Sequence, residues 1–181
     1  MIDMIEKSPM DGLLPLTEGT VTAAEIAQSA MWLVAPFKGK DASAVKALKK
    51  MGLAWPGPGV LVGDGPRTFV FSHAQILVMG AVPGKDMAKV AAVTDQSDAW
   101  AVMELSGADV RDVLARITGI PLGAGFGPGS AARCQVAHMS GAVLCTGADT
   151  FQVMVFRSMG PTLVHEVHTA MESVAALAGN A

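Results

Sequence analysis

The sequence ARCQVAHMSGAVLCTGADTFQVMVF, residues 132–156, holds three short apolar stretches separated by turn-forming residues. It predicts strands over residues 132–138, 142–146 and 151–156, with turns at Ser140-Gly141 and at Gly147-Ala148-Asp149. Consecutive strands joined by such short turns pair antiparallel. Residues 132–156 therefore predict an antiparallel meander.

A strand and an amphipathic helix precede this meander, and the same order of elements occurs earlier in the chain. Residues 100–105 read as a strand, and Gly107 and Asp109 introduce a helix that Gly119 ends. A closing helix is predicted from Pro161 onward. In the first half, the pattern predicts a strand over 31–37, a helix from Asp41 to Gly52, and strands over 68–72 and 75–81.

The spacing of anchor residues indicates an internal duplication. Trp32 and Gly39 are seven residues apart, as are Trp100 and Gly107. Further on, the tripeptide at residues 57–59, Gly-Pro-Gly, has a counterpart at residues 127–129. The sequence thus predicts an α+β fold of duplicated β-α-β-β type units with antiparallel sheets.

The predicted organisation is an extended N-terminal arm over residues 1–20 and a single α+β domain over 21–181. That domain comprises two pseudo-repeats, at about 30–82 and 98–177. Residues 83–94 are expected to link the units, with a short helix-like piece near residues 87–90. The apolar side chains of the arm must be covered, either by this domain or by a neighbouring chain.

Composition excludes several classes of protein. The chain is 51% hydrophobic and 16% charged, yet its longest apolar runs are far too short to cross a bilayer. A net charge of −3 argues against a nucleic-acid binder. No export signal is recognisable, so we expect a cytoplasmic protein in which Cys134 and Cys145 are buried, reduced thiols. The apolar surplus suggests a protein partner.

No catalytic motif stands out. Residues 123–129 are glycine-rich but lack the Lys-Ser/Thr of a phosphate loop, so a flexible connection is favoured. Asp95 and Asp98 favour a turn through Asx hydrogen bonding. His73 and His138 read as polar turn residues. We therefore predict no catalytic, cofactor-binding or metal-binding residue in this chain.

The last predicted helix carries the one arrangement that leaves a metal site open. His165 and His168 lie on one side of it, with Glu172 four residues beyond His168. A solvated or interface face is favoured over a metal site, because two clustered ligands rarely bind a metal alone. The roles of His165 and His168 stay open at this stage.

Several short motifs, in their order and spacing, resemble one protein family: the gamma subunits of heterotetrameric sarcosine oxidase. The resemblance is densest over residues 93–172 and thinner over 8–82. The motifs are SPMDGL (8–13), VTDQSDAW (93–100), LSGAD (105–109), VLAR (113–116), ARCQVAHM (132–139) and FRSM (156–159).

The resemblance implies a fold similar to the folate-binding domain of glycine-cleavage aminomethyltransferase. It also implies a non-catalytic accessory subunit in a complex with alpha, beta and delta subunits. In that family the complex oxidatively demethylates sarcosine to glycine, with tetrahydrofolate as one-carbon acceptor. The cofactors FAD, FMN, NAD, folate and zinc are implied for the partner subunits, and none for this chain.

The same resemblance bears on whether this chain binds folate. In aminomethyltransferases a Gly-Glu-Asp-Gly-Phe-Glu type turn carries a glutamate that binds the pterin. The matching stretch here is residues 147–152, where Ala148 replaces that glutamate and Gln152 replaces the second one. Alanine has no acceptor for the pterin edge. The alternative is a stand-alone folate-binding or folate-dependent protein, which would need Asp149 or Glu104 as a substitute and a partner such as Asp95.

Overall fold

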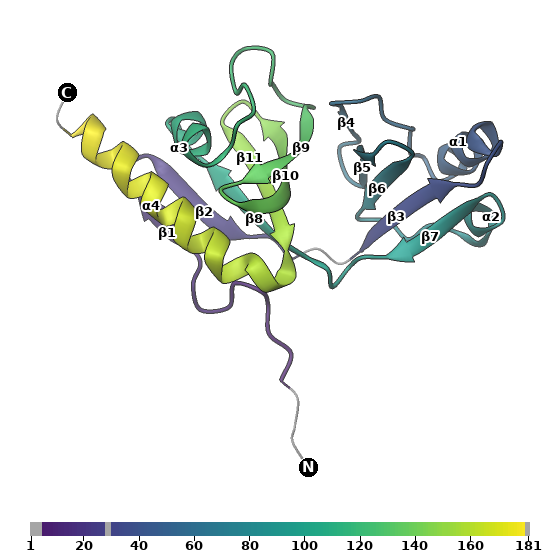
Figure 1. Cartoon of the computed structure of the whole chain (residues 1–181), viewed down its shortest axis with the longest axis horizontal. Helices are drawn as coiled ribbons and strands as arrows, with labels where there is room; N and C mark the ends of the chain where they lie inside the picture. Colours follow the sequence, from purple (N-terminus) through teal and green to yellow (C-terminus); the bar gives the residue numbers. More distant parts are fainter. Residues whose placement is uncertain (1–4, 28–29, 180–181) are drawn as a thin grey trace.

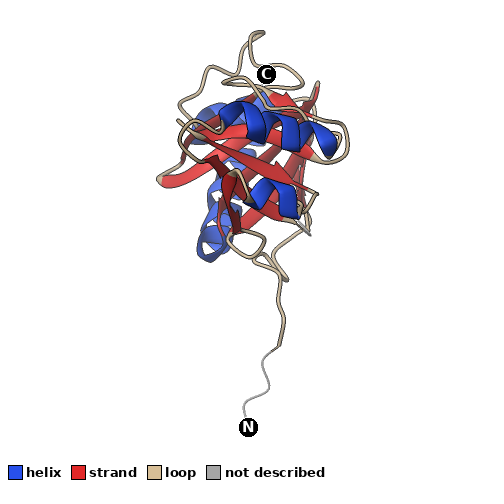
Figure 2. Ribbon diagram, turned by 90° about the vertical axis from the view of Figure 1, so that its right-hand side faces the viewer, coloured by secondary structure: helices blue, strands red, loops and turns tan. Residues whose placement is uncertain are grey.

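The chain forms two antiparallel sheets that are stacked face to face, with helices on both outer sides (Figure 1). The computed structural model describes residues 5–27 and 30–179. Seen from the side of sheet B, helices lie in front of the strands (Figure 2). No helix of the described part of the chain is long and apolar enough to span a membrane.

The strands of each sheet come from distant parts of the sequence. Sheet A has the order β1 (Leu16–Glu18), β2 (Val21–Glu25), β8 (Trp100–Ser106), β11 (Thr150–Phe156), β10 (Met139–Gly147), β9 (Ala131–Val136). Sheet B has the order β4 (Leu61–Val62), β5 (Arg67–Ser72), β6 (Gln75–Met79), β3 (Met31–Pro36), β7 (Ala91–Asp95). The helices are α1 (Asp41–Lys50), α2 (Lys85–Ala88), α3 (Val110–Ile117), the 3-10 turn η1 (Arg157–Met159) and α4 (Gly160–Ala178).

Three apolar layers hold these elements together. The outer face of sheet A packs against α3 and α4, and Phe151 and Leu114 are fully buried there. The outer face of sheet B packs against α1 and α2 around Leu48 and Met87. Between the sheets, side chains such as Met31 from sheet B meet residues of β8, β10 and β11. The result is a four-layer sandwich in which apolar side chains fill both faces of both sheets.

The predicted α+β duplication is confirmed, with one more strand in each unit than the β-α-β-β pattern predicts. In each half a strand and a helix lead into three antiparallel strands and a second helix. The two Gly-Pro-Gly loops meet where the sheets join: the Leu61 amide donates to the Gly129 carbonyl at 2.8 Å, and the Ala131 amide donates to the Gly59 carbonyl at 2.9 Å. This reciprocal pair is what two related units give when they pack together.

The tryptophan anchors are not equivalent within the repeat. Trp32 packs on the outer side of sheet B, whereas Trp100 is 4% exposed and lies between the sheets. Successive residues of a strand point to opposite faces of the sheet. If the two halves are aligned on their tryptophans, the alignment is therefore off by one residue, and the two tryptophans lie in different layers. The glycine loops, not the tryptophans, mark corresponding positions.

The N-terminal segment and the expected linker both contribute strands. Leu16–Glu18 and Val21–Glu25 pair with each other, and β2 pairs with β8 over Thr22–Glu25, so three residues of the expected arm, 16–18, belong to sheet A. Residues 1–4, at the start of that arm, lie outside the described residues. Likewise β7, within the expected linker, pairs along β3.

The ends of two predicted elements differ in detail. Ser140 and Gly141 lie inside β10, and the β9–β10 turn is at Ala137 and His138 instead. Gly141 is required within the strand, because a Cβ there would lie 2.5 Å from the Met154 carbonyl oxygen. The helix predicted from Asp41 begins there, but Lys40 is its N-cap and no side chain caps it.

Candidate functional site

The stretch aligned with the aminomethyltransferase pterin turn forms the β10–β11 hairpin. Ala148 and Asp149 are exposed in the turn, and the Ala148 carbonyl accepts a hydrogen bond from Arg111 at 3.1 Å. Gln152 lies two residues into β11, where its side chain is 7% exposed. Ala148 therefore lies in a solvent-facing turn and offers no acceptor side chain.

Gln152 faces Glu104 across the β8–β11 pair. The two residues are direct neighbours in register, and Gln152 Nε2 donates to Glu104 Oε2 at 3.4 Å. Along these strands Trp100, Val102 and Met154 point between the sheets. By alternation Glu104 and Gln152 share that face, so one carboxylate lies at the end of the inter-sheet layer.

The other acidic residues considered for folate chemistry lie elsewhere. Asp95 ends β7 and accepts hydrogen bonds from the Ser97 hydroxyl at 2.6 Å and the Ser97 amide at 2.9 Å, which confirms the Asx turn. These bonds lower the pKa of the Asp95 carboxyl. Asp149 is in the β10–β11 turn. Within residues 5–27 and 30–179, no hydrogen bond or ion pair joins Asp95, Asp149 and Glu104.

The histidines take the places the sequence indicates. His73 and His138 are exposed in hairpin turns, and His165 is exposed on α4. His168 Nε2 lies 3.5 Å from Glu18 Oε1 and 3.7 Å from Glu172 Oε1. Among the described residues, no three side chains of the metal-binding types form a group that could hold an ion. The contact between His168 and Glu18 places α4 beside the edge strand β1.

Arg111 organises the glycine-rich loop. Its Nη1 donates to the Leu122 and Phe126 carbonyls at 2.7 and 3.0 Å, and the guanidinium lies 4.9 Å from the centre of the Phe151 ring. The loop leads into β9 and not into a helix, so it lacks the helix N-terminus on which phosphate-binding loops rely.

The two cysteines are free thiols. Cys145 is buried and Cys134 is half-buried, and burial raises the pKa of each.

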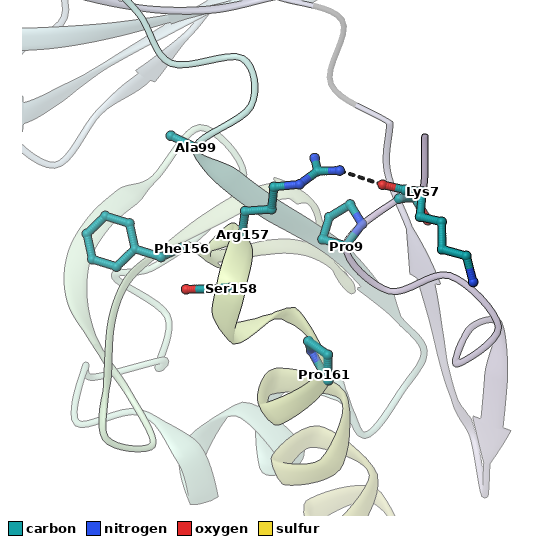
Figure 3. Close-up of a pocket in the computed structure, with 8 residues that line it drawn as sticks. Lys7, Pro9, Ala99, Phe156, Arg157, Ser158 and Pro161 are labelled. Atoms are coloured by element: carbon teal, nitrogen blue, oxygen red, sulfur yellow. Dashed lines mark hydrogen bonds between the residues drawn. The ribbon is translucent and has the colours of Figure 1, made fainter. Parts of the chain in front are cut away.

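An open groove of about 630 Å³ lies where the N-terminal segment crosses the start of α4 (Figure 3). Phe156 and Arg157, adjacent in sequence, point to opposite sides of it, and the Arg157 guanidinium donates to the Lys7 carbonyl. Pro9, Ala99 and Pro161 supply apolar surface. The groove contains no pair of acid and base groups in contact, and its open, mixed lining fits contact with another surface better than enclosure of a substrate.

Sequence reasoning assigned no role to Phe156 or to Arg133, which both lie against the Trp100 ring. Arg133 stacks over Phe71, with its Cζ 4.1 Å from the ring centre. The available signal was the single cation of β9, on the face that Ala131 and Gln135 share.

The architecture defines a class: a duplicated α+β protein with two stacked antiparallel sheets. The chain shares this fold with a chain of heterotetrameric sarcosine oxidase from Corynebacterium sp. U-96, solved with pyrrole 2-carboxylate. The TM-score is 0.78 at 20% identity, over 94% of this chain and 96% of that one. It is also similar to aminomethyltransferase T of the glycine cleavage system from Bartonella henselae, with a TM-score of 0.57 at 13% identity.

The two similarities differ in extent. The alignment with the aminomethyltransferase covers 90% of this chain but only 52% of that enzyme, so the chain spans about half of it. No protein-family model and no curated protein sequence matches the chain. The fold implied by the sequence resemblance is thus confirmed.

Proposed function

We propose that this chain is a non-catalytic accessory subunit of a heterotetrameric sarcosine oxidase, the gamma subunit. One observation carries the proposal: nearly the whole chain aligns with nearly the whole of one chain of such a complex. An accessory subunit needs the fold and its contact surfaces but no active site.

In this role the chain binds no cofactor of its own. Its partners are the alpha, beta and delta subunits, which carry the FAD, FMN, NAD, folate and zinc sites and demethylate sarcosine in the cytoplasm. The loss of both pterin-turn glutamates supports this division. Ala148 offers no carboxylate to the donor edge of a pterin, and a buried donor left unpaired costs about 1–3 kcal/mol.

Co-expression with the other three subunits tests the proposal. We expect the tagged chain to co-purify with all three at a fixed stoichiometry. Expressed alone, it should show no flavin absorbance and no sarcosine-dependent release of hydrogen peroxide. Flavin bound to the isolated chain, or failure to assemble with the three subunits, would contradict the proposal.

The runner-up is a stand-alone folate-binding or folate-dependent protein, and Glu104 is the observation that favours it. Its carboxylate lies beside Gln152 at the end of the inter-sheet layer, where it could accept hydrogen bonds from a pterin. Calorimetric titration with tetrahydrofolate separates the two functions. Binding that Glu104→Gln abolishes supports the folate protein, whereas no heat at millimolar ligand supports the accessory subunit.

A further inference from the structure

Four side chains from four different strands form a cluster that links the two sheets. We call Phe71, Trp100, Arg133 and Phe156 the Arg133 cluster. The Phe71 and Trp100 rings meet edge to face with centres 5.4 Å apart, and Trp100 and Phe156 stack at 4.8 Å. The guanidinium carbon of Arg133 lies 4.1 Å from the Phe71 ring centre and 5.5 Å from that of Trp100.

Arg133 is half-buried without a counter-ion. Its Nη2 donates to the Ser140 hydroxyl at 3.1 Å, but its buried Nη1 has no hydrogen-bond partner among residues 5–27 and 30–179. The buried Nε1 of Trp100, in the same cluster, is also unpartnered. No carboxylate within the described residues forms an ion pair with Arg133, and burial lowers the pKa of its guanidinium.

Such an arrangement is incomplete in the isolated chain. A guanidinium taken out of water loses hydration, and the faces of two aromatic rings return only part of it. The guanidinium is only half-buried, so an acceptor on another molecule can reach its accessible part, and a carboxylate is the acceptor that also neutralises the charge.

The surroundings of the cluster match an interface between proteins. Phe156 is 47% exposed and continues from the cluster into the open groove of Figure 3, where Pro9, Ala99 and Pro161 add apolar surface. Trp, Phe and Arg are the residue types enriched where protein interfaces are buried. A small carboxylate would leave this apolar surface in water, whereas a polypeptide would cover it.

We propose that the Arg133 cluster is a docking surface that receives an aspartate or glutamate side chain of a partner subunit, with Phe156 packed beside it. The proposal rests on the assignment of this chain to a sarcosine oxidase complex. It names the chemistry of the contact: a carboxylate on Arg133, flanked by apolar side chains.

Arg133→Met tests the contact, because methionine keeps an apolar stem against the rings and removes the charge. The isolated variant should melt at the same temperature as the wild type or higher, since an uncompensated charge has gone. Its affinity for the alpha, beta and delta subunits should fall about tenfold or more, as for other truncated buried ion pairs. Arg116→Met, on the exposed part of α3, is the matched control and should change neither quantity.

Two further experiments distinguish a failure of the variant to fold, or binding of a small anion, from a failure of the proposed contact. Phe156→Ser changes an exposed ring and should also weaken assembly, which tests the surface if Arg133→Met folds poorly. Sodium acetate tests the other source of a carboxylate: stabilisation of the wild-type chain alone that Arg133→Met abolishes, with assembly unchanged, would assign a small-anion site and overturn the docking surface.

The outcomes distinguish this inference from the proposed function. If the wild-type chain does not assemble with the three subunits, the proposed function fails and the docking surface with it. If the wild type assembles and both Arg133→Met and Phe156→Ser assemble equally well, the function stands and the docking surface is refuted.

Discussion

Met10 should stabilise the isolated chain even though it lies in a segment without regular structure. Its side chain is 1% exposed and belongs to the core between sheet A and its helices. Glu25 holds the same stretch by accepting hydrogen bonds from the Ser8 hydroxyl at 2.6 Å and the Met10 amide at 3.2 Å. If the segment were kept for a partner subunit, Met10 would contribute nothing to the chain alone.

We therefore expect Met10→Ala to destabilise the isolated chain. Replacing a buried methionine by alanine costs about 2–5 kcal/mol of stability. Because a segment at the surface can relax around the shortened side chain, we expect a cost in the lower part of that range, about 2–3 kcal/mol. For a domain of this size each kcal/mol lowers Tm by roughly 2–4 °C, so the expected loss is roughly 4–12 °C. Urea unfolding followed by circular dichroism should give the same free energy with an unchanged slope.

Leu13→Ala is the matched control for this experiment. Leu13 lies three residues away in the same segment but is 45% exposed, so its truncation should cost no more than about 0.5 kcal/mol. Equal melting temperatures for the two variants would refute the reasoning, because they would show that the segment does not dock on the isolated chain.

Two more variants test how the chain is held together. Gly160→Ala should lower stability by about 1–3 kcal/mol in thermal melts, because the new Cβ would lie 2.7 Å from the Pro9 carbonyl oxygen; Gly119→Ala, with nothing within 4 Å, should not. Asp95→Ala should lower Tm at neutral pH, because the Ser97 hydroxyl and amide bind the carboxylate and lower its pKa. A carboxyl whose pKa is lower in the folded than in the unfolded chain stabilises the fold at pH values above its unfolded pKa. The Tm difference between wild type and Asp95→Ala should therefore shrink below about pH 4, and a difference independent of pH would contradict this.

The parts of the fold that local pattern encodes could be predicted from the sequence. The apolar face of α3 and the meander of β9 to β11 follow from periodicities of 3.6 and 2 residues, which depend only on near neighbours. The repeat was visible because a Gly-Pro-Gly turn leaves a specific signature. Its reciprocal hydrogen bonds explain why both copies retain that turn.

The strands that sequence reasoning missed depend on distant partners. β2 and β7 have the sequences VTAAE and AAVTD, which are rich in alanine and have no strong strand pattern. β2 pairs with β8, about eighty residues later, and there occupies the place that β7 takes beside β3 in the other sheet. In sheet A a strand from the N-terminal part of the chain, β2, therefore fills the position that β7 fills in sheet B.

The same dependence on distant residues explains the candidate site. The absence of carboxylates at positions 148 and 152 could be read from the sequence, because it depends only on residue type within one turn. Arg133 could not be assigned, because its two aromatic neighbours come from β5 and β8 and its missing partner is a matter of three-dimensional contacts.

The apolar composition is a weaker argument for a partner than it first suggests. Most of the apolar residues fill three layers instead of one, because both faces of both sheets are covered. Among residues 5–27 and 30–179, the large apolar side chains left exposed are few and scattered along the chain, which is ordinary for a monomer. Phe156 is the exception, because it stacks on a buried tryptophan, Trp100, whose ring also lies beneath an arginine without a counter-ion. The contact surface that we propose therefore rests on one half-buried arginine without a counter-ion and the exposed Phe156 ring, and Arg133→Met tests it more directly than any count of hydrophobic residues.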